Sequence, residues 1–506
     1  MATSTRSTAA YVAVAIVTVS AATAAAWTFT AVGTSPTPLL LTKPPGFVAA
    51  DIVERRRRDD FAAMQQFRPG YRFWRDVFTM PDGLVAFGSA IDGRVLATVP
   101  AKGEWAPHAV WLDSTVAGIL DGQSFAHRLS DRREQVELLL TRTAGPVLQN
   151  STRGDALLQS VPTYGSFLAE WGAIYERFGV PGDVGLAQAI VESGLSGTRR
   201  SEANAVGFCQ WLQQNWNTLN YFSATPIDAN NQTSQAPYCA AYLSVLATKY
   251  GSFIPALSEH HAGATNVGRA LINGEHLGAH DVRAQYLLGS KLARDLRTLH
   301  AREYENVYHS YGPRSYLYAE MAFGNTFNVR HLIAAIPQES IYAMRTPRAI
   351  SLGEIVKRTG LSAKEVQRFN PALTRRLEAD GTLYLPYYAS GFGSDVAFWR
   401  RLPSRSYLDV LDDFMRLDAG AEQWDDAAFA PVLADFRRRF RGTNTEEGAV
   451  MDTVLAYVMD QAYTSGRRTL LSDFRRNEQV QHLLERGVRE LKVLRTRRAL
   501  ASAAMF

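Results

Sequence analysis

The stretch Gly185-Leu-Ala-Gln-Ala-Ile-Val-Glu-Ser-Gly194 contains one charged side chain, Glu192, close to its end. Pro181-Gly182-Asp183, just before it, is a favourable helix start in which Asp183 can cap the first amides. Gly194 is a typical helix stop. A helix without charge along its length is typical of one buried on most of its faces. The sequence therefore predicts a buried helix that carries Glu192 in its last turn.

The expected surroundings of Glu192 favour a protonated carboxyl group. The residues three, four and seven positions before it are Ala189, Gln188 and Gly185, so we expect a small, open face that a substrate can approach. Burial disfavours the carboxylate anion, and so does the negative end of the helix dipole, so we expect both to raise the pKa of Glu192. A carboxyl group that stays protonated near neutral pH can serve as a general acid.

A second motif, Ser201-Glu-Ala-Asn-Ala-Val-Gly-Phe-Cys-Gln210, follows the pair Glu192-Ser193. Together the two resemble the catalytic domain of the lytic murein transglycosylases, whose loop reads Ser-x-Ala-Gly-Ala-x-Gly-Leu-Met-Gln. Asn204 stands in place of the first Gly, and Asn is the best substitute where a left-handed backbone is needed. The resemblance covers residues 160–300 and implies a lysozyme-like helical domain in which Glu192 is the catalytic residue.

The resemblance also implies residues that contact the substrate. Four aromatic residues lie near the loop in the sequence: Trp211, Trp216, Tyr221 and Phe222. We expect each ring either to stack on a sugar ring of the substrate or to belong to the core. Tyr286 takes a position like that of a Tyr in the family's last helix. The substrate-binding candidates are Ser193, Gly207, Gln210, His260, His261 and Tyr286.

One segment departs from the family, which has Ala-Tyr-Asn-Ala-Gly where this chain has Glu259-His260-His261-Ala262-Gly263. His260 replaces the Tyr that reaches toward the catalytic Glu, and His261 replaces the Asn. A neutral His can still donate a hydrogen bond to a carboxyl group, whereas a protonated one would lower the pKa of Glu192. The two His are adjacent, without the spacing of a zinc site, so we expect no metal and no cofactor.

The family cleaves the β-1,4 bond between N-acetylmuramic acid and N-acetylglucosamine and forms a 1,6-anhydro end. The resemblance implies this reaction here, with Glu192 as general acid and then base, and peptidoglycan glycan strands as the partner. Two alternatives stay open. The first alternative is a non-catalytic wall-binding or scaffold protein. The second is a hydrolytic, inverting muramidase in which Glu259 is the second carboxylate. A solvated helix position is the other interpretation of Glu259.

Bulk composition describes an ordinary globular chain of several domains: 506 residues, 46% hydrophobic, 20% charged and a net charge of +5. That charge is compatible with an anionic wall polymer and too small to indicate nucleic acid. Residues 11–32 are rich in Ala, Val and Thr, behind a lone Arg6, and form either a signal peptide or a membrane anchor. Either one exports the remainder to the periplasm or cell envelope. Export permits a Cys209–Cys239 disulfide, although two buried thiols are the alternative.

A second resemblance covers residues 341–388 and is to the LysM module, a glycan-binding unit of two helices on a two-stranded sheet. The motif runs Ile350-Ser-Leu-Gly-Glu-Ile-Val-Lys-Arg-Thr-Gly360, then Leu361-Ser-Ala-Lys-Glu-Val-Gln-Arg-Phe-Asn-Pro371, then Leu383-Tyr-Leu-Pro386. Gly360 is expected to stop the first helix and Ser362 to cap the second. The family's opening Gly-Asp is missing.

We therefore predict an α+β, mainly α protein with a small N-terminal β-rich region, a βααβ module and a helical C-terminal region. Short alternating segments from Phe67 to Pro107 indicate the strands, with residues 111–160 helical. The charge runs at residues 54–60, 436–441 and 495–498 are expected on solvated helix faces, or for the last two in contact with acidic polymer or lipid. The expected parts are 1–46 (signal peptide or anchor plus linker), 47–155 (N-terminal α/β region), 156–300 (catalytic domain), 301–340 (helical connector), 341–388 (LysM-like module) and 389–506 (helical region).

Overall fold

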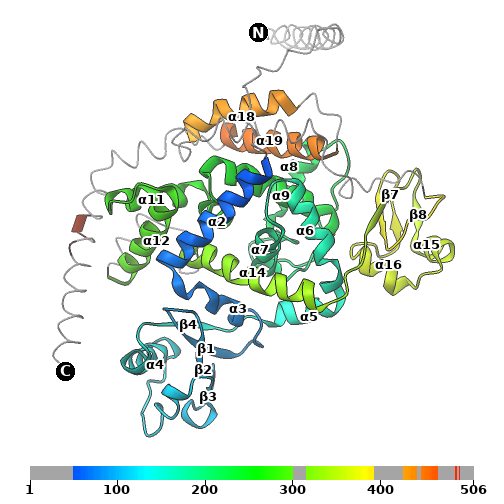
Figure 1. Ribbon diagram of the computed structural model, residues 1–506. Helices are drawn as coiled ribbons and strands as arrows, with labels where there is room; N and C mark the ends of the chain where they lie inside the picture. Colours follow the sequence, from blue (N-terminus) through cyan, green and yellow to red (C-terminus); the bar gives the residue numbers. More distant parts are fainter. Residues whose placement is uncertain are drawn as a thin grey trace, which may run out of the picture. The chain divides into compact units, whose positions relative to one another are not determined.

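The computed structural model describes residues 49–299, 315–392, 426–440 and 446–464, with Glu485, Arg486 and Arg489. They fold mainly as helices with small antiparallel sheets, so the predicted α+β, mainly α class is confirmed (Figure 1). None of the helices in these ranges is long and apolar enough to cross a membrane. The export segment at residues 11–32 and the basic run at 495–498 lie outside the described residues.

The largest part is a group of helices around α7 (Figure 1). Two short strands, β5 (Ala205–Val206) and β6 (Trp211–Leu212), pair beside it, and short helical turns are η4 (Gly165–Phe167) and η5 (Ser315–Leu317). The helices are α2 (Ala49–Phe67), α5 (Asp155–Tyr164), α6 (Leu168–Arg177), α7 (Gly182–Ser193), α8 (Gln213–Phe222), α9 (Gln232–Tyr250), α10 (Phe253–Ala262), α11 (Ala264–His276), α12 (Val282–Leu299) and α14 (Tyr318–Ala335).

Helix α7 is buried as predicted, since every residue from 184 to 190 is inaccessible to solvent. The expected open face is wrong, however, because Gly185, Gln188 and Ala189 are all buried. A Cβ atom on Gly185 would lie 2.0 Å from the ring of Tyr175 in α6. Glycine at this position therefore lets α6 and α7 approach closely.

Helix α14 crosses α7 in the antiparallel direction, although its residues belong to the range expected to form a connector. Tyr318 at its start contacts Glu192, and Arg330 near its end pairs with Asp183 at 2.9 Å. Asp183 also pairs with Arg57 of α2 at 3.0 Å, so its predicted capping role is wrong. These contacts make α14 part of the same core as α7.

Helix α2 carries the charge run that was expected on a solvated face. Glu54, Arg55 and Arg58 are exposed, but Asp60 is 0% exposed and Arg56 6% exposed. The prediction is therefore wrong for the face of α2 that packs against α10 and α12. Because charged side chains are buried only with partners, this face requires matched groups on those helices.

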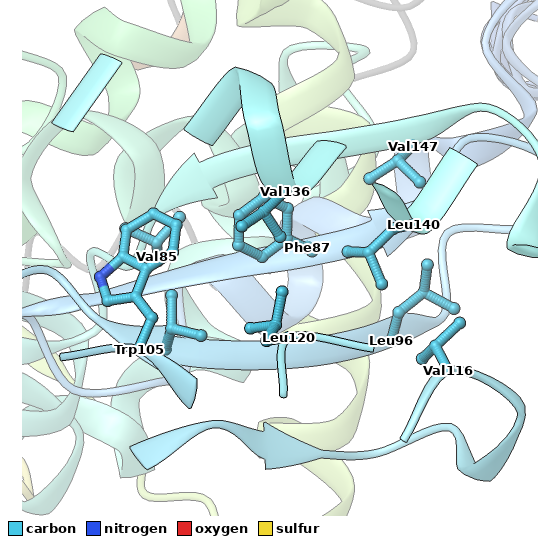
Figure 2. Close-up of a cluster of buried hydrophobic side chains, with 10 residues drawn as sticks. Val85, Phe87, Leu96, Trp105, Val116, Leu120, Val136, Leu140 and Val147 are labelled. Carbon is cyan, nitrogen blue, oxygen red and sulfur yellow. The ribbon is translucent and has the colours of Figure 1, made fainter. Parts of the chain in front are cut away.

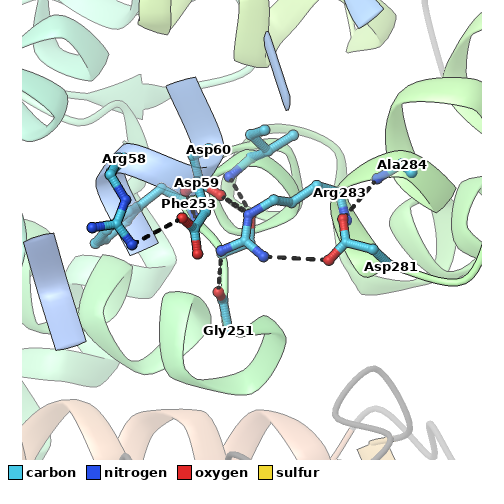
Figure 3. A network of polar contacts seen from close by, with 10 residues as sticks. Arg58, Asp59, Asp60, Gly251, Phe253, Asp281, Arg283 and Ala284 are labelled. Carbon is cyan, nitrogen blue, oxygen red and sulfur yellow. Dashed lines mark hydrogen bonds and ion pairs between the residues drawn. The ribbon is translucent and has the colours of Figure 1, made fainter. Parts of the chain in front are cut away.

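Asp60 finds such partners at the start of α10 and in α12 (Figure 3). It accepts hydrogen bonds from the Ser252 hydroxyl and the Phe253 amide, both at 2.7 Å. The guanidinium of Arg283 pairs with it at 2.5 Å and also donates to the Gly251 carbonyl at 2.9 Å. The network joins α2 to the helices next to Glu192.

The N-terminal β-rich region is confirmed as one antiparallel sheet in the order β3-β2-β1-β4. Helix α4 (Leu129–Ala144) covers it, and Val136 and Leu140 from this helix pack on Phe87 and other strand residues (Figure 2). The strands are β1 (Leu84–Ser89), β2 (Val95–Pro100), β3 (Val110–Trp111) and β4 (Val147–Ser151); short helical segments are η1 (Pro69–Arg72), α3 (Phe73–Val77), η2 (Ala106–His108) and η3 (Ser114–Val116). Strand β4 and the last residue of β3 lie in the range 111–160 that was predicted to be helical, so the prediction is wrong there.

Residues 341–388 contain the predicted βααβ order, but two strands rather than one lie on each side of the helix pair, in two two-stranded sheets. The Ser362 side chain accepts from the amide of Glu365, and Gly360 ends the preceding helix with φ +72°, as expected from the sequence. The Asn370 side chain forms two hydrogen bonds with the backbone of Tyr384 in β10. It donates to the carbonyl and accepts from the amide, as a neighbouring strand would. The elements are β7 (Tyr342–Arg345), β8 (Ile350–Ser351), α15 (Leu352–Thr359), α16 (Ala363–Phe369), β9 (Arg376–Leu377) and β10 (Thr382–Leu385), with β7 paired to β10 and β8 to β9.

The C-terminal region contributes α18 (Asp426–Phe440) and α19 (Glu446–Thr464). Helix α19 packs against α8 and α9. In the basic run of α18, Phe436 and Phe440 are buried, while Arg438 is 73% exposed as expected for a solvated face. The helical character predicted for this region is therefore confirmed in its described parts.

Candidate functional site

Glu192 lies in the last turn of α7, which Gly194 ends in the left-handed conformation at φ +61°, as the sequence predicts. Its side chain is 13% exposed, so the carboxyl group is mostly shielded and still reachable. The Tyr318 hydroxyl donates a hydrogen bond of 2.5 Å to Oε1. The site thus begins with a shielded carboxyl group held by one phenol.

Two histidines approach the same carboxylate oxygen from the end of α10. His261 Nδ1 lies 3.8 Å and His260 Nε2 4.0 Å from Oε1 of Glu192. The His261 ring stacks on Tyr318 with centroids 4.4 Å apart and planes 6° apart. His260 Nε2 lies 2.7 Å from the Cys209 carbonyl oxygen, which can only accept, so Nε2 carries the hydrogen.

These neighbours decide the pKa of Glu192. Burial raises it, but the contacts with His261, the charge of His260 and the Tyr318 hydrogen bond together lower the pKa below its ordinary value. The predicted rise is therefore wrong, because sequence spacing did not show how close the imidazoles come. Burial lowers the pKa of His260 below its ordinary value, and the nearby Glu192 offsets part of this shift.

The loop of residues 201–210 is fixed to α7 and α9. The Ser193 hydroxyl lies 3.0 Å from the carbonyl oxygens of both Ala189 and Phe208, which binds the helix end to the loop. Cys209 and Cys239 form a disulfide, which attaches the loop to α9. Ser193 is 1% exposed, so the structure gives it a structural role, and its contact with a sugar stays a prediction.

Gly207 and Gln210 complete this loop. Gly207 has φ +83°, and a Cβ atom there would lie 2.3 Å from Oε1 of Gln235, so only glycine fits. Gln210 donates its amide hydrogens to the carbonyls of Arg199 and Gly207, both at 3.0 Å. The amide nitrogen of Gln210 is thus used within the loop, and its contact with substrate stays a prediction.

Glu259 and Tyr286 lie elsewhere than expected. Glu259 is buried and pairs with Lys249 at 3.1 Å, and the Tyr250 hydroxyl also donates to it. Both partners belong to α9, so Glu259 is buried rather than solvated, and its role as a second carboxylate stays a prediction. Tyr286 is 1% exposed within α12.

Tyr318 is the site residue that sequence reasoning missed. It comes 126 positions after Glu192, in a range assigned to a connector. The small residues Ala319, Ala322 and Gly324 indicate a closely packed helix, and a Cβ atom on Gly324 would lie 2.5 Å from a backbone oxygen of Tyr71. That signal predicts burial of the helix but names no partner for the phenol.

The aromatic candidates divide between core and surface. Trp216 is 0% and Trp211 5% exposed, whereas Tyr221 is 83% exposed. Trp211 contacts Tyr242 with ring centroids 4.9 Å apart and Tyr457 of α19 at 5.9 Å. The two tryptophans therefore belong to the core that packs against the loop. Of the four candidate rings, Tyr221 is the one most exposed to solvent.

The left-handed backbone predicted for Asn204 is confirmed at φ +61° and gives a stability test. We expect Asn204→Ala to lower the free energy of unfolding by about 1 kcal/mol, because Ala has no side chain that compensates this conformation. Asn204→Gly should be tolerated. Asn217→Ala is the matched control, since Asn217 is exposed in α8, where Ala is favoured. Equal effects of the two Ala variants in urea unfolding would contradict the argument.

Comparison with known proteins gives no family for this chain. No protein-family model matches it, and no curated protein matches it in sequence. The function must therefore be argued from the residues around Glu192 and their chemistry.

Proposed function

We propose that this protein is a lytic murein transglycosylase with a lysozyme-like catalytic domain. The observation that carries the proposal is Glu192 itself, a carboxyl group 13% exposed at a helix end, hydrogen-bonded by Tyr318 and adjoining the loop of residues 201–210. A shielded and reachable carboxyl group of this kind suits a general acid. The sequence resemblance of the helix and the loop supplies the reaction class.

The proposed reaction needs one carboxyl group. Glu192 donates its proton to the glycosidic oxygen as the bond from that oxygen to the anomeric carbon breaks, and the N-acetyl group of the substrate assists at that carbon. The sugar's 6-hydroxyl oxygen then bonds to the anomeric carbon and releases its proton to the Glu192 anion. Atoms balance without water, and the product is a 1,6-anhydro sugar. Tyr318 holds the carboxyl oxygen in place through both steps.

The remaining parts fit the same proposal. We propose that residues 341–388, with their βααβ arrangement, are a LysM-like module that binds glycan strands. Export by the N-terminal segment would bring the chain to the periplasm or cell envelope, with the segment retained as an anchor or removed. Peptidoglycan glycan strands are the proposed partner.

Digestion of purified murein sacculi followed by mass spectrometry tests the function. Anhydro-muropeptides support the transglycosylase, and muropeptides with reducing ends instead would indicate hydrolysis. Binding to sacculi without any release would indicate a non-catalytic wall-binding protein. Each outcome selects one of the three functions that the sequence left open.

The structure bears differently on the two alternative functions, the hydrolytic muramidase and the non-catalytic wall-binding protein. The hydrolytic one is less favoured, because Glu259, its proposed base, is buried in an ion pair with Lys249 on α9. The non-catalytic one is favoured by a specific observation, since the lowered pKa of Glu192 leaves less of the acid form at neutral pH. The digest should therefore be run in mildly acidic as well as neutral buffer.

Tyr318→Phe tests the hydrogen bond to Glu192. We expect turnover to fall about 10- to 100-fold, since a hydrogen bond to a charged group is lost. The pKa of Glu192 should rise, because this bond contributes to lowering it. Tyr175→Phe is the matched control, since Tyr175 is an equally buried phenol that packs on Gly185. If both variants lost the same activity, the loss would reflect packing.

A further inference from the structure

His261 stands out among the groups around Glu192, because it is the more exposed of the two histidines. Its side chain is 33% exposed, against 4% for His260. The stack on Tyr318 fixes the imidazole plane with Nδ1 toward the carboxylate. The partly exposed His261 ring is therefore held at a fixed distance from Glu192.

The backbone around the pair adds a second constraint. Glu192 lies in the last turn of α7 and His261 in the last turn of α10, so two helix C-termini meet there. The negative end of a helix dipole favours a protonated imidazole and disfavours a carboxylate anion. Opposite charges within about 4–6 Å shift each other's titration by about 1–3 pH units. The contact with His261 therefore couples the pKa of Glu192 to the imidazole and opposes the effects of burial and of the helix end on that pKa.

Other charges near the pair are compensated. Burial lowers the pKa of His260 and raises the pKa of the phenols Tyr175 and Tyr318. Several charged groups on the helices packed against α7 and α10 are held in ion pairs or hydrogen bonds, and burial, together with the charge of Asp183, raises the pKa of Glu176. The pairs are Lys249 with Glu259, Asp60 with Arg283, Arg68 with Glu320, Asp183 with Arg57 and Arg330, Arg177 with Glu447, and Arg269 with Asn266. Of the two histidines beside Glu192, His261 is thus the nearer and the more exposed.

We propose that His261 is a positioning residue that makes Glu192 an acid only in acidic solution. His261 Nδ1, 3.8 Å from Oε1, helps to lower the pKa of Glu192, so the carboxylate persists to lower pH than in an ordinary glutamate. The acid form of Glu192 is then populated only as the pH falls. Cleavage should then increase toward acidic pH. This consequence for activity rests on the proposed function, whereas the coupling itself does not.

The coupling can be measured without turnover. The carboxyl ¹³C shift of Glu192 is followed by NMR against pH in the full chain, in the wild type and in His261→Asn. We expect the pKa of Glu192 to rise by about 1–3 units in the variant, because the neighbouring cation is removed. His261→Phe keeps an aromatic ring on Tyr318 and should give the same shift, which guards against a loss of packing. His280→Asn, at an exposed histidine, should give none.

The activity readout separates this inference from the proposed function. In the sacculus digest, the alkaline limb of the pH profile should move to higher pH by the same shift of about 1–3 pH units in His261→Asn and in His261→Phe. An unchanged Glu192 titration in both variants overturns the inference. If the titration shifts and no variant releases anhydro-muropeptides at any pH, the coupling stands and the proposed function fails.

Discussion

Glu192→Gln should abolish release of anhydro-muropeptides, with a loss of about 10²- to 10⁴-fold as expected for removal of a general acid. Glutamine is nearly isosteric and keeps an oxygen that can accept the 2.5 Å hydrogen bond from Tyr318. The variant should therefore fold normally and still bind sacculi. Mass spectrometry of the digest measures the loss, and a pull-down with sacculi measures the binding.

Glu202→Gln is the matched control for this variant. Glu202 is an exposed glutamate in the loop that adjoins the site, so its amide form removes a charge nearby without touching the proposed acid. We expect it to retain wild-type turnover. A Glu192→Gln protein that cleaved at the wild-type rate would rule out Glu192 as the acid and end the transglycosylase proposal.

Features that depend on neighbours in the sequence were predictable. The end of α7 at Gly194, the left-handed backbone of Asn204 and the cap at Ser362 follow from what single residue types allow in φ and ψ. The βααβ order of residues 341–388 follows from the same local signals. Such interactions are recorded in a few adjacent residues, so they can be read without knowing the fold.

Features that depend on distant segments were not predictable in this way. Tyr318 reaches Glu192 across 126 positions, and Asp60 reaches Ser252 across 192. The run of charged residues in α2 has the same sequence whether the inner face of the helix contacts water or Arg283. Because charged side chains are more often solvated, the sequence alone favoured a solvated face. The direction of the pKa shift of Glu192 failed for the same reason, since it depends on the approach of α10.

Asp60 and Arg283 give the largest expected effect on stability. Asp60 is 0% exposed, and Arg283 is its counter-charge. We expect Arg283→Met to lower the free energy of unfolding at about pH 7.5 by about 3–5 kcal/mol, because it leaves a buried carboxylate without its partner. Urea unfolding measures the change. Arg376→Met is the control, since Arg376 and Glu378 are 60% and 70% exposed and such a pair contributes about 0–1 kcal/mol.

The pH dependence of this effect has a definite sign. Burial, partly offset by Arg283, raises the pKa of Asp60 to about 6, so the folded state keeps this proton to higher pH than the unfolded chain. A group of this kind costs stability as the pH rises through the interval between its unfolded and folded pKa values, and the cost is constant above it. Removing Arg283 raises the folded pKa of Asp60 further and widens that interval upward. The variant should therefore lose more stability relative to the wild type at about pH 7.5 than at about pH 5, where Asp60 can be protonated. A loss that is equal at both pH values would mean that Arg283 contributes packing rather than charge to the joint between α2 and α12.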